Sequence, residues 1–192
     1  MKLYLNGIIT RVIKGLYNDG NSDKATLAAL RSCTNLLSPK ASKVWPLLLS
    51  SLPEEALSKD GRPTYAEKAS FAALHAYAIY QQGTDQLVFA SRTEQGQNLC
   101  RALAGLRSND DLRTALDRRM QVLLMATNYE ALTNDLFHLL EILKAQRTGI
   151  LLDFGQLTQD LFYFQTSSQA ARQICLKWGQ EYYQTAANSK KE

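Results

Sequence analysis

Apolar residues recur along most of the chain at intervals of three and four, the spacing that places them on one face of an α-helix. No segment shows the alternation typical of a β-strand, and the apolar run at residues 149–152 is too short to predict one. The pattern therefore predicts an all-α protein of eight or nine helices joined by short loops. The predicted helices cover residues 3–17, 23–37, 44–52, 65–83, 97–106, 112–127, 129–147, 154–165 and 168–185.

The helix predicted at residues 65–83 has clear signals at both ends. Pro63 disfavours helical conformation in the residue before it, and Thr64 and Glu67 have the spacing of a capping box. Gly83 can adopt the left-handed conformation that closes the far end. The start and the end of this alanine-rich segment therefore favour the same helix.

The helix predicted at residues 23–37 lies between a turn and a proline. Residues 18–22 form a polar turn that also supplies a cap, and Pro39 stops the helix. Helical spacing directs four of its side chains inward, namely Leu27, Leu30, Thr34 and Leu37.

The longest predicted loop lies near residues 83–96, which are polar, bounded by glycines and contain Arg92. Such a segment is the best candidate for a mobile connection. We therefore predict two adjoining small helical bundles within one compact unit. The N-terminal lobe covers residues 1–90 and the C-terminal lobe covers residues 91–192.

Composition is that of an ordinary globular protein, with 45% hydrophobic and 21% charged residues. Cys33, Cys100 and Cys175 are odd in number, far apart and set in apolar helical surroundings, which predicts buried, reduced thiols. No apolar run approaches the roughly 18–20 residues that span a bilayer. The first residues also make a poor signal peptide, so we expect a cytoplasmic protein without membrane contact.

Charge is distributed unevenly within a formal net charge of +4. Residues 1–43 carry seven lysines and arginines against two aspartates, whereas the remainder is close to neutral. This distribution suggests one basic face, and such a face favours a polyanion through release of counterions. A solvated helix surface without a partner explains the same charges, so charge alone leaves both interpretations open.

The sequence contains no convincing catalytic or metal-binding constellation. His75 and His138 lie mid-helix in apolar surroundings, where packing explains a histidine better than a role as ligand or base. Asp110 and Asp111 follow Asn109 at a helix start, which favours capping over carboxylate catalysis. We therefore predict a protein that is not an enzyme and that uses no metal or cofactor.

Arginines of the second half are candidates for contacts with phosphate groups. Arg118 and Arg119 are adjacent, so at most one can point toward the core, and a guanidinium group suits phosphate oxygens. A salt bridge to Asp117 is an alternative for one of them. Arg101 and Arg107 lie six residues apart and could approach the adjacent pair across two packed helices.

Four more cations lie near helix ends or on the last helix. Lys144 and Arg147 end a helix, where the helix dipole stabilises cations whatever the partner. Arg172 and Lys177 stand about 140° apart around the axis of the last helix.

Aromatic residues near these cations allow two interpretations. Trp178, Tyr182 and Tyr183 could stack on bases, but their spacing of four to five residues is more typical of a core. Trp45 receives the same interpretation.

Several motifs occur together in a fixed order. The helix at residues 65–83 ends in Leu-His-x-x-x-x-x-Gln-Gln-Gly, a Trp-Pro block occurs at residues 44–48, and paired arginines precede an apolar run at residues 117–126. These features resemble the CasB family, the small subunit of the type I-E CRISPR surveillance complex called Cascade. The resemblance extends over residues 28–32, 44–48, 74–83, 98–103, 117–126, 152–162 and 174–183.

The resemblance implies an all-helical subunit without catalytic activity, present in two copies in each Cascade. Such subunits lie along the crRNA-bound backbone, contact guide and target strands, help hold the displaced strand and so stabilise the R-loop. The implied partners are crRNA, single strands of target DNA, the backbone and large subunits, and a second copy of the chain. Basic positions of the family fall on Arg31, Arg101, Arg118, Arg119 and Lys177. Charge and placement add Arg107, Lys144, Arg147 and Arg172.

The sequence also departs from the family pattern. Ser32, Cys100 and Gln180 stand where an arginine, a glycine and a basic residue are frequent. These departures predict a less positive groove, or one rebuilt from Lys14 and Lys24. The alternative function is a helical module that joins protein partners without touching nucleic acid, which exposed apolar area on one face would favour.

Overall fold

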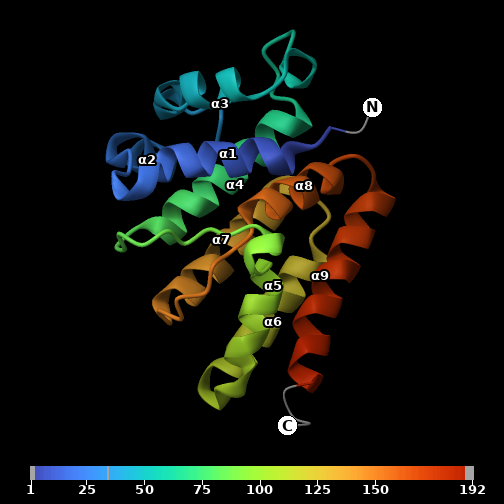
Figure 1. Cartoon of the computed structure of the whole chain (residues 1–192). Helices are drawn as coiled ribbons and strands as arrows, with labels where there is room; N and C mark the ends of the chain where they lie inside the picture. The colour runs from blue at the N-terminus through green and yellow to red at the C-terminus, as the bar shows by residue number, and fades with distance from the viewer. Residues whose placement is uncertain (1–2, 34, 189–192) are drawn as a thin grey trace.

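The computed structural model describes residues 3–33 and 35–188, and within these ranges it contains nine α-helices and no extended strand. This arrangement confirms the all-α prediction (Figure 1). The helices are α1 (Leu5–Tyr17), α2 (Lys24–Ser32), α3 (Trp45–Ser51), α4 (Tyr65–Gln81), α5 (Leu99–Gly105), α6 (Asp110–Met125), α7 (Tyr129–Ala145), α8 (Phe154–Phe164) and α9 (Ser168–Asn188).

Helix α4 forms the centre of the fold. Thirteen of its 17 residues are buried, and it packs against α1, α2, α3, α7 and α8. A helix that is apolar or small on every side has no face suited to water, so the other helices cover it. The segment with the strongest helical signals in the sequence therefore became the central helix.

The predicted start of α4 is confirmed, whereas the helix ends at Gln81, two residues before the predicted Gly83. The Glu67 amide donates to Thr64 Oγ1 at 3.1 Å, and the Thr64 amide donates to Glu67 Oε2 at 2.7 Å. These reciprocal bonds satisfy two of the amides that a helix start leaves without partners. At the far end Gly83 has a φ of +88°, which only glycine adopts without strain.

Helix α8 crosses α1 at a point that accepts only glycine. A Cβ atom on Gly155 would clash with the side-chain oxygen of Asn6 and would lie 2.9 Å from both the Asn6 carbonyl oxygen and Thr10 Oγ1. Because α8 also packs on α4, an element of the second half of the chain completes the core of the first half. One hydrophobic core cluster includes residues of both predicted lobes, and the boundary near residue 90 stays a prediction.

Helices α5, α6 and α9 lie away from α1, α2 and α3, and α9 runs along one flank (Figure 1). Helix α9 packs against α5, α6 and α8. Trp178 and Tyr182 are buried in this contact, which confirms the core interpretation for both, whereas Tyr183 remains 38% exposed.

The connection between α4 and α5 is held against the segment that precedes α8. Phe89 is buried, and Leu152 forms isolated parallel bridges with Phe89 and Gln97. The apolar run at residues 149–152, too short to predict a strand, thus pairs with two points of the connection.

Helix α2 is shorter than predicted. It ends at Ser32, and Leu37 is 69% exposed, so the prediction that Leu37 points inward is wrong. The Asn35 carboxamide accepts a hydrogen bond from the Leu37 amide at 2.9 Å, a local turn that competes with the helix ahead of Pro39. Thr34 lies outside the described residues.

Two single-residue predictions are also wrong. Trp45 is 40% exposed, and its indole nitrogen donates to the Leu36 carbonyl at 3.0 Å. His138 is exposed although buried Leu139 and Leu140 follow it. Successive helical residues lie about 100° apart, so apolar neighbours in sequence do not bury a side chain. The prediction for the three cysteines is confirmed, because all three are free and buried.

Candidate nucleic-acid interface

The nine cations singled out in the sequence fall into groups with different surroundings. Arg101, Arg118, Arg119 and Arg147 are exposed. Within residues 3–33 and 35–188, no carboxylate lies within 4.0 Å of these four guanidinium groups. A guanidinium group that makes no ion pair keeps its N–H donors available for phosphate oxygens. These four residues are here called the exposed arginines.

Arg107 has a carboxylate partner within the protein. Its Nε and Nη2 atoms donate to the two oxygens of Asp117 at 2.8 and 3.2 Å. The guanidinium carbon also lies 5.1 and 5.3 Å from the ring centres of Tyr182 and Tyr183, within cation–π range. The Asp117 salt bridge considered for Arg118 or Arg119 is therefore made by Arg107, which lies in the turn before α6 and contacts the middle of α6 and two tyrosines of α9.

Asp117 is the centre of this contact. Burial raises the pKa of its carboxyl, but hydrogen bonds from Arg107 and Tyr182 outweigh burial and lower the pKa below the ordinary value of 3.8. The Tyr182 hydroxyl donates to Asp117 at 2.6 Å. The carboxylate thus stays charged and holds three elements together.

Lys177 is also paired within the protein. Its ammonium group donates to both oxygens of Asp160 at 2.8 Å, and Asp160 is 3% exposed. The Trp178 indole donates to the same carboxylate at 2.9 Å, and the Gln156 side-chain Nε2 donates to it at 2.8 Å. These donors compensate the cost of burying the charge of Asp160.

Arg31 and Lys144 lie near each other at helix ends, although 113 positions separate them in the numbering. Arg31 donates to the Ala78 carbonyl at 3.3 Å near the end of α4, and Lys144 donates to Gln82 Oε1 at 3.1 Å. Burial lowers the pKa of Lys144, and the charge of Arg31 lowers it further. The expected structural role of Lys144 at a helix end is consistent with this geometry.

Arg172 is exposed, and its guanidinium group donates to the Leu124 carbonyl at 2.8 Å. Leu124 lies in the last turn of α6, where carbonyl groups lack helical partners. Arg172 therefore caps a neighbouring helix while part of its charge faces solvent.

A polar hollow of about 300 Å³ lies beside the exposed Arg101. It includes Arg92, which the sequence analysis placed in a mobile connection and left out of the candidate site. The local signal for order was the capping-box spacing of Ser91 and Glu94. The hollow is lined by Arg92, Gln95, Gly96, Gln97, Asn98, Arg101, Asp153, Gln156 and Glu181.

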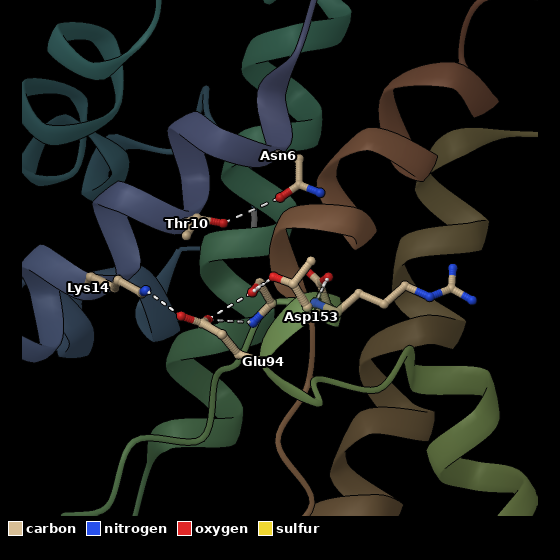
Figure 2. A network of polar contacts seen from close by, with 8 residues as sticks. Asn6, Thr10, Lys14, Glu94 and Asp153 are labelled. Carbon is tan, nitrogen blue, oxygen red and sulfur yellow. Dashed lines mark hydrogen bonds and ion pairs between the residues drawn. The ribbon is translucent and has the colours of Figure 1, made fainter.

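The loop that carries Arg92 is tied to two helices, as Figure 2 shows for Lys14, Glu94 and Asp153. The Lys14 ammonium group of α1 donates to Glu94 at 3.1 Å, and the Arg92 amide donates to Asp153 Oδ2 at 2.8 Å. A Cβ atom on Gly96 would clash with the Ala90 carbonyl oxygen, so this turn requires glycine.

No catalytic arrangement emerges from the titratable residues. His75 lies against Phe71 and Phe137, and its Nδ1 donates to the Leu30 carbonyl at 2.7 Å, as expected for a packed histidine. Burial lowers its pKa. In the two ranges that the structure covers, no three histidine, cysteine or acidic residues are grouped as metal ligands, and no helix has the length and apolarity to cross a membrane.

The fold is all-helical and presents four exposed arginines with no carboxylate within 4.0 Å among the described residues, whereas Arg107 and Lys177 are paired with Asp117 and Asp160. The sequence matches the family of CRISPR-associated protein Cse2 over residues 26–183. The chain therefore belongs to the Cse2 family. A search of curated proteins found no match.

Solved structures of CasB share the fold, which confirms the resemblance found in the sequence. CasB from Thermobifida fusca is 26% identical, with a TM-score of 0.68 over 94% of this chain and 96% of that chain. CasB from M. ruber is 18% identical, with a TM-score of 0.69 over 99% and 98%. A chain of a CRISPR RNA-guided surveillance complex is also 18% identical, with a TM-score of 0.75 over 98% of both chains.

Proposed function

We propose that this chain is a non-catalytic small subunit of a type I-E CRISPR Cascade complex and that it holds single strands of nucleic acid through their phosphates. Family membership and the likeness to a surveillance-complex chain support this proposal. The observation that carries the binding function is the exposure of Arg101, Arg118 and Arg119 without a carboxylate partner among the described residues.

Phosphate contacts suffice for the proposed role. Exchange of a DNA duplex for a guide–target heteroduplex is nearly balanced in free energy, so modest contacts to the strands decide whether the open state persists. Phosphate contacts position a strand without reading its sequence, which base pairing with the guide already reads. The protein then stabilises the R-loop without a catalytic step.

The proposed partners follow from this role. They are crRNA, the target and displaced DNA strands, the backbone and large subunits of Cascade, and a second copy of this chain. Such a complex would act in the cytoplasm, where its guide and target are present.

Charge reversal in the assembled complex tests the proposal. We expect Arg101→Glu, Arg118→Glu and Arg119→Glu together to weaken target binding at least about tenfold. The slope of log K against log salt concentration should become shallower by roughly two to three, because each lost phosphate contact removes roughly 0.7–0.9 from it. The control has Lys40, Lys43 and Lys59 changed to Glu, which alters the net charge equally on exposed residues elsewhere. Equal binding by the wild type and the arginine variant would overturn the proposal.

An exposed apolar surface favours the second candidate, a module that contacts protein partners. Leu37, Trp45 and Leu49 are 69%, 40% and 37% exposed beside a hollow of about 330 Å³ that Leu57 and Pro63 also line. An exposed apolar cluster of this kind marks a contact site for another protein. If Leu37→Asp and Leu49→Asp together abolish incorporation into the complex while strand binding by the free chain persists, this surface serves assembly.

A further inference from the structure

The hollow beside Arg101 differs from a simple path for phosphates because its lining carries both signs of charge. Arg92 and Arg101 supply two guanidinium groups, and Asp153 and Glu181 supply two carboxylates. Asp153 is buried, and its two oxygens accept the amides of Arg92 and Gln156, each at 2.8 Å. Asp153 therefore shapes the wall, and Glu181 adds a second carboxylate to the lining.

Glu181 lies in the field of the cations around the hollow. Burial raises the pKa of Glu181, Lys177 lowers it, Asp160 raises it, and Arg92 and Arg101 lower it to a smaller extent. The side chain is half-buried on α9, facing the loop and α5 across the hollow. A polyphosphate track would not place an acid among its arginines, so a ligand with both donors and acceptors fits this lining better.

Four carboxamides complete the wall and also offer both donors and acceptors. Asn98 uses its carbonyl oxygen to accept the amides of Cys100 and Arg101, so its amide nitrogen is the group it could offer a ligand. Gln156 donates its amide nitrogen to Asp160, so its carbonyl oxygen is the corresponding group. Carboxamides, carboxylates and arginines are the side chains that pair with the edges of nucleobases.

The backbone around the hollow is held in place before any ligand binds. The Gly96 amide donates to the Ser91 carbonyl at 2.8 Å, and the Asp153 amide donates to the Gln97 carbonyl at 2.9 Å. Gln95, a non-glycine residue, has a φ of +72°, a conformation that persists only where its surroundings enforce it. A fixed backbone that presents polar side chains, two of them held by their own hydrogen bonds, is the arrangement expected of a specific site.

We propose that this hollow receives one unpaired nucleotide of a bound strand. Its phosphate lies against Arg92 and Arg101, and the edge of its base meets the carboxamides of the lining. The volume of about 300 Å³ is at the lower limit of ligand pockets, so one nucleotide fits and a helix does not. The base must be unpaired, because pairing uses the same edge that the protein would contact. The inference rests on the proposed binding of single strands and names a subsite within it.

Strands with and without bases test the proposal. The purified full-length chain is titrated at low salt with a 20-nucleotide oligothymidine and with an abasic 20-mer that has the same phosphates. We expect the base-bearing strand to bind at least about fivefold more tightly. Gln97→Ala should remove this preference while leaving affinity for the abasic strand unchanged, and Arg92→Ala should weaken both and also remove the preference. Oligouridine and oligocytidine arms distinguish RNA from DNA and one base from another.

Matched controls separate the hollow from the rest of the surface. Gln146→Ala and Arg11→Ala change exposed residues of the same types outside the hollow, and both should keep the wild-type preference for bases. A single 5-bromouracil in the thymidine strand should cross-link to residues 92–101, 153–156 or 181 on irradiation.

The outcomes separate this inference from the proposed function. If the wild type binds both strands equally, or if the preference survives in Gln97→Ala and Arg92→Ala, the nucleotide subsite is wrong while phosphate binding stands. If the chain binds neither strand even at low salt, both proposals are overturned. A cross-link confined to other residues would also contradict the subsite.

Discussion

Cations lie in two different regions of the molecule. In the contact between α9 and its neighbours they are paired with acids, and on the outer surfaces of α5 and α6 they are exposed without such a partner among the described residues. Arg107 and Lys177 each donate two hydrogen bonds to a carboxylate, and Asp160 is buried beneath its lysine. Arg118 and Arg119, one helical turn or less from Asp117, are exposed. The difference teaches that a cation's role is decided by whether the fold brings an acid within reach, which residue type alone does not reveal.

The largest expected loss of stability comes from replacing Asp160, the buried carboxylate. Asp160→Ala leaves Lys177, Trp178 and Gln156 without their shared acceptor, so we expect a loss of about 3–5 kcal/mol in the free energy of unfolding. Urea denaturation measures it. Asp85→Ala, an exposed loop residue, is the control and should change stability by less than about 0.5 kcal/mol. If Asp160→Ala lowers the free energy of unfolding no more than the control does, the Asp160–Lys177 pair has no structural role.

Removing Arg107 should have a smaller effect. Arg107→Ala breaks the two-bond contact with Asp117 and the contacts with two tyrosine rings, and the expected loss is about 1.5–3 kcal/mol. Denaturation is again the measurement. Arg11→Ala, which removes an exposed arginine of α1, is the matched control, and an equal change in both variants would show that the Arg107–Asp117 contact adds nothing.

The same contact predicts a pH dependence. The pKa of Asp117 is lowered on folding, so its contribution is fully present above the unfolded pKa near 3.8 and is lost as the pH falls through the lower folded value. The stability difference between the wild type and Asp117→Asn should therefore be constant near neutral pH and shrink in acid. If the stability difference between the two proteins instead grows below about pH 4, folding raises the pKa of Asp117 rather than lowering it.

The exposed arginines should show the smallest change in stability and a clear change in binding. Arg118→Ala and Arg119→Ala together should alter the free energy of unfolding by less than about 0.5 kcal/mol, because no carboxylate of the described chain lies within reach of either. The slope of log K for strand binding against log salt concentration should become shallower by roughly 0.7–0.9 for each lost phosphate contact. A large loss of stability with unchanged strand binding would show that Arg118 and Arg119 support the fold instead of binding a strand.

Local signals predicted the helices well where a cap and a stop agreed. Thr64 and Glu67 define the start of α4. The Asn109, Asn128 and Asp153 side chains accept amide hydrogen bonds at three other helix starts, as expected. Prediction failed at the end of α2, where a turn at Asn35 competed with the helical pattern.

The candidate site was predictable in residue type but not in arrangement. Arg31 lies near Lys144 although the two are far apart in the chain. Glu181 likewise lies near Arg92 and Arg101, which come from a distant segment. Spacing along a sequence reports only neighbours within a helix turn or two. The order of Arg92 depends on bonds to α1 and to the start of α8, which no local pattern contains.

The sequence by itself determined the helical class, most helix limits, the buried thiols and the family to which the chain belongs, because caps, periodicity and ordered motifs are local properties. Only the tertiary structure decided which cations are neutralised and which remain exposed. Pairing depends on distances between side chains of different helices, and those distances follow from how α9 packs on α5, α6 and α8. Electrostatic interactions weaken with separation and solvent, so a few ångströms decide whether an arginine supports the fold or faces a ligand.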